Sequence, residues 1–220
     1  MKYLIGADFG GSSSKATLLA EDGHVVMTAS LEYPTMYPAI GWAEQNPQDW
    51  WNAFVGNIRT LLSASGVAPE SIVAIALDAA THTAVLLDRH DHPVRNAIYW
   101  TDARASKEAT QLQDQYGDEI IRLSFNSVSS LWTLPQLLWL CRHEPEAIQQ
   151  TCKVMSVKDY IRYRLTGDYV TDDIEAMGFM LLDANTNRWS ERLCGMAGIR
   201  ADIMPPIVRP ETHLSPMCKQ

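Results

Sequence analysis

Cysteine is scarce in this sequence, and no spacing pairs the cysteines that are present. The chain has four of them in 220 residues, at Cys141, Cys152, Cys194 and Cys218. No two form a C-x-x-C pair, and no histidine follows at zinc-finger spacing. A dense disulfide framework and a structural zinc site are therefore excluded, and we expect reduced, mostly buried thiols.

Long apolar runs and clusters of basic residues are lacking as well. No stretch reaches the 18 or so apolar residues that a membrane span requires, and the first apolar run breaks at Gly6 and Asp8, too early for a signal peptide. The formal net charge is -8, and lysine and arginine are scattered along the chain. We therefore predict a globular, cytoplasmic protein without a membrane or nucleic-acid partner.

Three short strands are predicted at the start of the chain. Apolar runs at residues 3–7, 15–20 and 24–31 have strand length. A glycine- and serine-rich turn separates the first two strands, and the turn sequence Glu21-Asp22-Gly23 separates the second and third. This pattern predicts an antiparallel meander.

A helix and two further strands complete the first hundred residues. Asn46 or Asp49 can cap a helix whose apolar residues recur at three- and four-residue spacing up to Gly66. Residues 71–77 and 83–87 are apolar runs of strand length. Three strands, a helix and another strand are the order expected of a ribonuclease H-like (actin-like ATPase) core, an α/β fold with a mixed sheet.

Helical periodicity dominates from about residue 101 onward. The predicted helices span residues 103–116, 131–142, 145–151, 157–165 and 191–196. Pro135 lies in the second of these, which therefore either begins near it or is kinked. We expect a core at about residues 1–100 and an added helical region at about 101–220.

The strongest local signal for function follows the first strand. It is the sequence Asp8-Phe9-Gly10-Gly11-Ser12-Ser13-Ser14-Lys15. An aspartate at a strand end can hold a hydrated magnesium ion, glycines let a phosphate approach the backbone, and serine hydroxyls donate to its oxygens. The alternative is a polar hairpin turn in which glycine and serine only form the turn.

A second polar segment, Asp78-Ala79-Ala80-Thr81-His82, follows the predicted strand at residues 71–77. Polar groups at strand ends often face a ligand crevice in open sheets, and a histidine can hydrogen-bond a sugar hydroxyl. A single histidine is more often a structural residue than a ligand.

A third segment, Tyr99-Trp100-Thr101-Asp102-Ala103-Arg104, precedes the first predicted helix of the helical region. Trp100 offers an apolar ring face against which a sugar can pack, and Asp102 can cap the helix. Asp102 and Arg104 can either pair with each other or bind hydroxyls. Ordinary packing accounts for the same residues.

Three acidic residues gather later, at Asp172, Asp173 and Glu175. Close carboxylates can act in acid–base chemistry or bind a metal, but an acidic helix start is the simpler interpretation, because negative charge is favourable at a helix N-terminus.

Taken together, these segments resemble the FGGY family of carbohydrate kinases, and most closely its xylulose kinases. The resemblance runs through most of the chain: GADFGGSSSK (6–15), GWAEQNP (41–47), THTAVLLD (81–88), NAIYWTDAR (96–104), PQLLWL (135–140) and KDYIRYRLTG (158–167). Ordered matches at the right intervals are far more specific than any single motif.

The resemblance implies an ATP-dependent kinase of two domains that binds a sugar and MgATP. It assigns magnesium to Asp8, and it assigns the phosphate turn to Gly10, Gly11, Ser12, Ser13 and Lys15. It assigns the sugar site to Thr81, His82, Trp100, Asp102 and Arg104. The family's catalytic aspartate and nucleotide-binding domain lie beyond residue 220, so we expect the chain alone to be inactive. A homodimer is expected for the complete enzyme.

Three positions depart from the family pattern, and two of them leave the identity of the sugar undecided. The family usually has threonine at Gly11, and the xylulose kinases usually have glutamine and methionine at Ala80 and Thr81. The expected acceptor is a ketopentose, with D-xylulose first and L-ribulose, L-xylulose or glycerol as alternatives. A non-catalytic, actin-like module that senses or binds sugar is the alternative of another class.

Overall fold

The computed structural model describes residues 1–218, which divide into two compact units. The first unit comprises Met1–Thr35 and Asn46–Ala80. The second comprises residues 36–45 and the chain from Thr81 onward. Among the described residues, no helix is long and apolar enough to cross a membrane.

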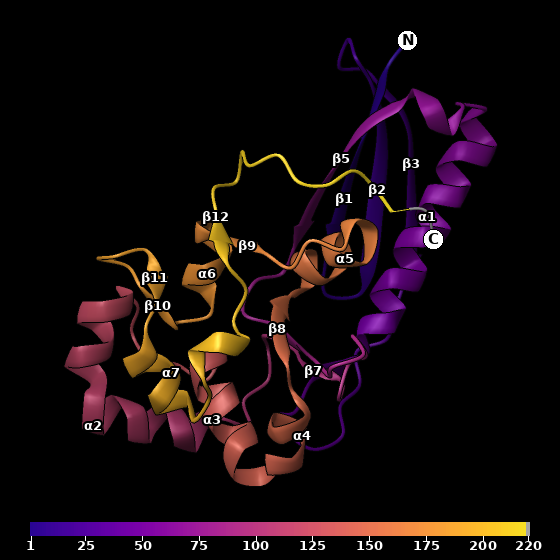
Figure 1. Ribbon diagram of the computed structural model, residues 1–220. Helices are drawn as coiled ribbons and strands as arrows, with labels where there is room; N and C mark the ends of the chain where they lie inside the picture. Colours follow the sequence, from indigo (N-terminus) through magenta and orange to yellow (C-terminus); the bar gives the residue numbers. More distant parts are fainter. Residues whose placement is uncertain (219–220) are drawn as a thin grey trace. The chain divides into compact units, whose positions relative to one another are not determined.

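The first unit contains a four-stranded mixed sheet (Figure 1). Its strands are β1 (Tyr3–Phe9), β2 (Ser13–Ala20), β3 (Val25–Glu32) and β5 (Ile72–Ala79). The order is β3-β2-β1-β5, in which β2 pairs antiparallel with both β1 and β3, while β5 runs parallel to β1. The predicted meander and the predicted mixed sheet are both confirmed.

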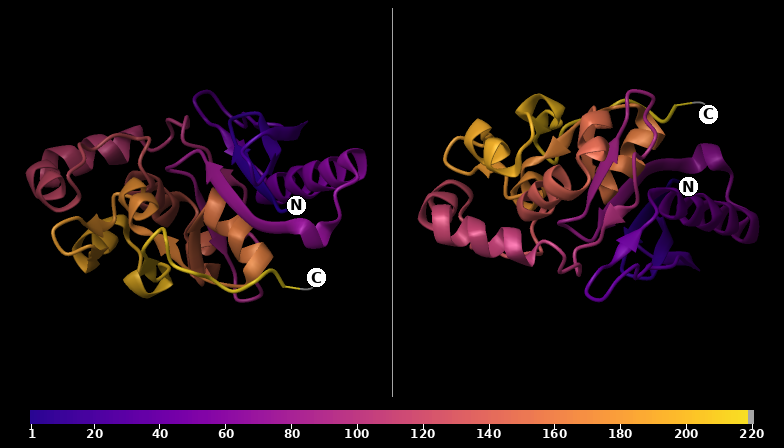
Figure 2. Two further views of the ribbon diagram at one scale, coloured as in Figure 1. Left: turned by 90° about the horizontal axis from the view of Figure 1, so that it is seen from above. Right: turned by 90° about the horizontal axis from the view of Figure 1, so that it is seen from below.

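Helix α1 (Pro47–Ser65) lies along one face of this sheet (Figure 2). The Asn46 side chain accepts the Gln48 amide at 3.0 Å, and Gly66 ends the helix in the left-handed conformation at φ 69°. Asn46 is therefore the cap, as predicted. Trp50 and Phe54 are buried, and β1 and β2 bury alternate residues, so the core of this unit lies between α1 and the sheet.

The second unit is mainly helical. Its helices are α2 (Ser106–Ser124), α3 (Thr133–His143), α4 (Pro145–Gln150), α5 (Val157–Thr166), α6 (Asp173–Gly178) and α7 (Glu191–Ala197). Short strands pair as β4 (Glu44–Gln45) with β7 (Ala97–Ile98), β6 (Ala84–Leu87) with β8 (Lys153–Ser156), β9 (Thr171–Asp172) with β12 (Ile207–Val208), and β10 (Leu182–Asp183) with β11 (Arg188–Trp189). A single-turn helix follows α1 at Pro69–Ser71, and another lies at Ala201–Ile203.

Two predicted boundaries in this unit differ from the structure. Helix α2 begins at Ser106 without a side-chain cap, so the predicted capping role of Asp102 is wrong. The helix also continues to Ser124, past the predicted end at residue 116, because Ile120 on its next turn is fully buried. Pro135 lies at the third position of α3, which confirms that this helix begins near the proline.

Candidate functional site

The phosphate turn predicted from the sequence joins β1 to β2, and the sheet register places charged side chains beside it. Asp8 pairs with Lys15 across the antiparallel ladder and with Asp78 across the parallel one. Paired residues of neighbouring strands project from the same face of a sheet. All three residues are exposed, so the end of β1 carries two carboxylates and an ammonium group.

Asp8 is electrostatically perturbed in this setting. Partial burial and the Asp78 carboxylate raise its pKa above the ordinary value, while Lys15 and the Phe9 amide lower it; the net pKa is raised. The raised pKa means that ionising Asp8 costs free energy in the folded chain. A cation bound nearby would lower that cost. Asp78 was not among the predicted site residues, because only strand pairing brings it to Asp8.

These residues are suited to the magnesium nucleotide that the resemblance implies. Magnesium in proteins commonly keeps several waters and binds through one or two carboxylates together with substrate phosphates. Asp8, with Asp78 beside it, offers such carboxylates on an exposed surface. A Cβ on Gly10 would lie 3.6 Å from the Ser13 carbonyl oxygen and 3.9 Å from Asp8 Oδ2, both ordinary contact distances, so Gly10 lies directly beside the Asp8 carboxylate.

The second unit holds the predicted histidine in a fixed orientation. His82 has φ 62°, a left-handed conformation that is uncommon for residues other than glycine. Its Nδ1 lies 2.9 Å from the Gly178 carbonyl oxygen, and its ring meets the edge of Trp132 with centroids 4.3 Å apart. Since a carbonyl only accepts, Nδ1 donates. In the neutral ring, Nε2 is then an acceptor for a ligand hydroxyl.

Space around His82 depends on Gly178 in α6. A Cβ at that position would lie 3.3 Å from His82 Nδ1 and 3.6 Å from Thr81 Cβ. Glycine therefore allows α6 to approach both predicted sugar-site residues closely. This contact could not be predicted from the sequence, because 96 positions separate Gly178 from His82.

Of the three site residues predicted in the segment Trp100 to Arg104, Trp100 is exposed and the other two are buried. Trp100 is 39% exposed, whereas the side chains of Asp102 and Arg104 are both 0% exposed. Arg104 Nη2 donates to Asp102 Oδ2 at 2.8 Å, and Nη1 donates to Glu44 Oε1 at 2.8 Å. Of the two alternatives that the sequence left open, the structure shows the mutual pair.

Aromatic stacking and backbone bonds complete this buried network. The Arg104 guanidinium lies 3.8 Å from the centre of the Trp42 ring. Asp102 accepts the amides of Ala43 and Arg104 at 2.5 and 2.8 Å. The network thus joins the β4 segment to the chain around Trp100, which explains why residues 36–45 belong to the second unit.

The acidic residues near α6 serve the fold. The Asp172 side chain caps α6 by accepting the Glu175 amide at 2.8 Å, and it accepts Lys158 Nζ at 2.6 Å. Although burial alone would raise the pKa of Asp172, the bonds from Lys158 and the Glu175 amide hold it below the ordinary value. A carboxylate held in this way is a poor proton acceptor, which favours the helix-start interpretation.

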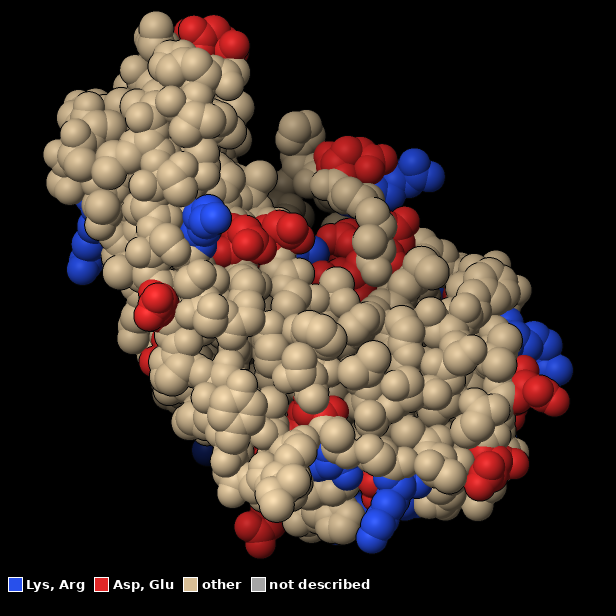
Figure 3. Space-filling model, turned by 180° about the vertical axis from the view of Figure 1, so that it is seen from behind, with Lys and Arg blue, Asp and Glu red and all other residues tan. Residues whose placement is uncertain are grey.

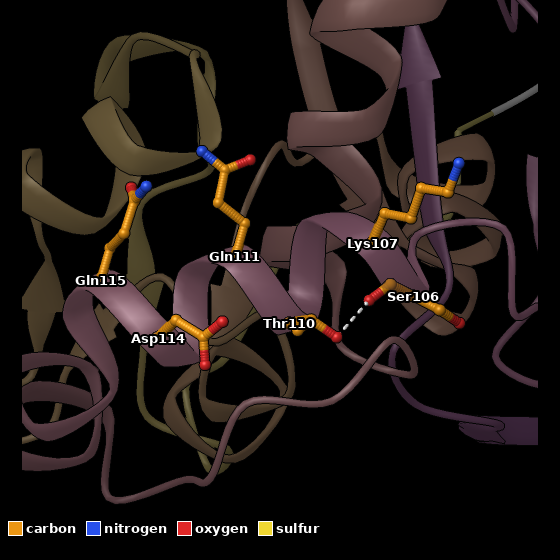
Figure 4. Close-up of a pocket in the computed structure, with 6 residues that line it drawn as sticks. All are labelled: Ser106, Lys107, Thr110, Gln111, Asp114 and Gln115. Carbon is orange, nitrogen blue, oxygen red and sulfur yellow. Dashed lines mark hydrogen bonds between the residues drawn. The ribbon is translucent and has the colours of Figure 1, made fainter.

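The rest of the surface offers weaker candidates. Lysine and arginine are scattered among acidic residues on the face drawn in Figure 3, in keeping with the net charge of -8. A hollow along α2 is lined by Ser106, Lys107, Thr110, Gln111, Asp114 and Gln115 (Figure 4). Its lining comes from one helix, so it has no opposing wall, and it contains none of the predicted site residues.

Comparison with known proteins gives consistent matches over nearly the whole chain. Residues 3–219 match the family model for the FGGY family of carbohydrate kinases, N-terminal domain. The xylulose kinase of Bacillus subtilis (strain 168) is 37% identical over 213 residues, which are 97% of this chain and 42% of that protein.

Two crystal structures from Lactobacillus acidophilus are also similar, one described as a gluconate kinase and one as a ligand-bound xylulose kinase. Both have a TM-score of 0.92 at 28% identity, and the match covers 99% of this chain and 44% of theirs. The predicted actin-like ATPase fold is confirmed by this likeness. The chain spans less than half the length of these relatives.

Proposed function

Because this chain belongs to the FGGY family of carbohydrate kinases, we propose that it supplies the sugar-binding half of an enzyme that transfers the γ-phosphate of ATP to a hydroxyl of a ketopentose. The observation that carries the proposal is the end of β1, where a glycine- and serine-rich turn adjoins the exposed Asp8, Lys15 and Asp78. A polar hairpin that only turned the chain would not need two carboxylates, Asp8 and Asp78, opposite each other beside it.

In this proposal the first unit handles the phosphates. The Gly10 amide already donates to the Ser13 carbonyl at 3.0 Å. The other amides and the hydroxyls of the turn at residues 10–13 donate to phosphate oxygens, and Lys15 adds positive charge beside them. Asp8 would hold the magnesium ion, with Asp78 able to bind its water shell. When bound, the ion neutralises charge that develops on the transferring phosphoryl group. Positioning and charge stabilisation then account for most of the catalysis.

The second unit is proposed to bind the sugar. His82 accepts a sugar hydroxyl at Nε2, since Gly178 fixes the proton on Nδ1. Thr81 and Trp100 offer an exposed hydroxyl and an exposed ring. Asp102 and Arg104 act indirectly, because their buried pair holds the segment that carries Trp100.

We propose D-xylulose as the first candidate substrate, because proteins described as xylulose kinases recur among the relatives. Ala80 and Thr81 change the shape of the xylulose kinase pocket, which keeps L-ribulose, L-xylulose and glycerol as alternatives. Gluconate joins them through the gluconate kinase likeness. MgATP is the proposed phosphate donor.

The general base is proposed to come from the part of the family enzyme that follows this domain. A base must lie within about 2.6–3.2 Å of the attacking hydroxyl. Asp172 and Glu175 are engaged in the network around Lys158 and do not offer one. The 220-residue chain is therefore expected to release no sugar-dependent ADP in a coupled assay, and release well above the sugar-free rate would place the base within it.

Titration with MgATP separates the kinase from the rival, a non-catalytic sugar-binding module. A kinase domain binds MgATP through the turn, and Asp8→Asn weakens this binding. The matched control is Asp22→Asn, which changes an exposed aspartate in the β2–β3 turn of the same unit. Calorimetry on the complete enzyme, in which the nucleotide-binding domain is present, should show the loss in the Asp8 variant alone. Sugar binding with no MgATP binding would favour the rival module.

A further inference from the structure

Every carbonyl oxygen of the turn at residues 10–13 accepts a hydrogen bond from the segment that follows β3. The Tyr33 hydroxyl has one proton, which it shares between the carbonyl oxygens of Gly10 at 2.6 Å and Ser13 at 3.1 Å. The Ser13 carbonyl also accepts the Gly10 amide at 3.0 Å. The Tyr33 amide donates to the Ser12 carbonyl at 3.0 Å. Thr35 Oγ1 donates to the Gly11 carbonyl at 3.1 Å. Two residues therefore hold four consecutive carbonyl groups.

This arrangement also sets the direction of the amides. The described residues have no cis peptide bond, and in a trans peptide the amide N–H points opposite to the carbonyl of the preceding residue. With the Gly10 and Gly11 carbonyls held by Tyr33 and Thr35, the Gly11 and Ser12 amides point away from those two side chains. Successive amides that point to one side form a concave site for an anion.

The orientation matters because a phosphate oxygen and a carbonyl oxygen both carry negative charge. A turn whose peptide groups rotated freely would present carbonyls to the phosphate part of the time, and this would weaken binding. Tyr33 is only 6% exposed, so water competes little for its hydroxyl. Thr35 is exposed, and its hydroxyl donates to the Gly11 carbonyl.

We propose that Tyr33 and Thr35 are positioning residues for nucleotide binding: their hydroxyls keep the carbonyl oxygens of the turn away from the phosphates, so that its amides and serine hydroxyls face them. This inference rests on the proposed function of the turn. Neither residue touches the nucleotide; both act through residues 10–13.

Removing either hydroxyl while keeping the shape of the side chain tests the inference. Tyr33→Phe keeps the ring, and Thr35→Val keeps the branched side chain. A neutral hydrogen bond contributes about 0.5–1.5 kcal/mol, so each variant should bind MgATP about 2- to 12-fold more weakly. The matched control is Thr28→Val, because Thr28 bonds Thr17 at 3.2 Å on the same sheet and does not contact the turn.

The measurement is a titration of the complete, 15N-labelled enzyme, in which the nucleotide-binding domain is present, with MgATP, followed at the amides of residues 10–14, with a D-xylulose titration in parallel. We expect weaker MgATP binding in both turn variants, unchanged MgATP binding in Thr28→Val and unchanged sugar binding throughout. A purely structural role would weaken sugar binding as well. Should Tyr33→Phe fail to fold, Thr35→Val gives the same test at an exposed site.

The two ideas fail in different ways. If MgATP shifts the turn amides and both variants bind it as tightly as the unmodified chain, the positioning role is wrong and the proposed function stands. If MgATP shifts no turn amide in the unmodified complete enzyme, the proposed function fails together with this inference.

Discussion

Replacing Asp78 by asparagine removes a carboxylate that the parallel register of β1 and β5 places opposite Asp8. The change keeps the size of the side chain and deletes one charge. Both residues are exposed, so solvent screens their repulsion. Like charges opposite each other in a sheet destabilise it by about 0.2–1 kcal/mol, and we expect Asp78→Asn to recover that amount.

The effect should depend on pH in a defined direction. Burial and Asp78 raise the pKa of Asp8 above 3.8, its ordinary value, so the folded chain holds this proton more tightly than the unfolded chain. Ionising Asp8 therefore costs stability as the pH rises through the raised pKa. The gain from Asp78→Asn is expected at pH 7 and should fade as the pH falls well below 3.8, where Asp8 is protonated in both the folded and the unfolded chain.

Thermal unfolding and an NMR titration of the Asp8 carboxyl group provide the assay. A gain of this size corresponds to a rise in the melting temperature of about 0.5–4 °C at pH 7, together with a lower pKa of Asp8. Lys15→Gln is the control of opposite sign, because Lys15 lowers the pKa of Asp8. If Asp78→Asn leaves both the melting temperature and the Asp8 titration unchanged, the proposed charge cluster at the end of β1 is refuted.

Two further substitutions test the second unit by urea unfolding. Gly198→Ala should lower the free energy of unfolding by about 1–2 kcal/mol, because Gly198 has φ 77° and a Cβ there would lie 2.8 Å from Cys141 Sγ. Gly195→Ala, in α7 with open space around it, should instead stabilise by about 0.5–1 kcal/mol, and equal effects of the two would contradict this reasoning. Asp102→Asn should cost about 3 kcal/mol or more, since it breaks the buried pair with Arg104, and a loss under 1 kcal/mol would show that the pair is dispensable.

The parts of the fold that the sequence predicted well depend on local signals. Asn46, Pro47 and Gly66 mark both ends of α1 within the helix and its flanks. The meander follows from three apolar runs separated by short polar turns. The turn between β1 and β2 was likewise predictable, because its residues are contiguous, while its role in phosphate binding stays a prediction.

Features built by distant pairing could not be predicted in the same way. Asp78 meets Asp8 only through the register of two parallel strands that are far apart in the sequence. The Gly178 carbonyl reaches His82 across 96 positions. Whether Asp102 and Arg104 faced a ligand or each other depended on burial, which the sequence does not show. Glu44 pairs with Arg104, yet it precedes Arg104 by 60 positions and belongs to the same unit only in the folded chain.

Sugar binding to a His82 variant tests the central claim most directly. The account predicts that the 220-residue chain binds D-xylulose or one of its alternatives in a calorimetric titration. It predicts that His82→Ala weakens this binding by about 1–3 kcal/mol, because a hydrogen bond is lost and the sugar hydroxyl is left unpaired. His90→Ala, at an exposed histidine in the turn after β6, should bind as the unmodified chain does. Sugar binding that is equal in all three proteins, or absent from the unmodified chain, would contradict the assignment of His82 to the sugar site.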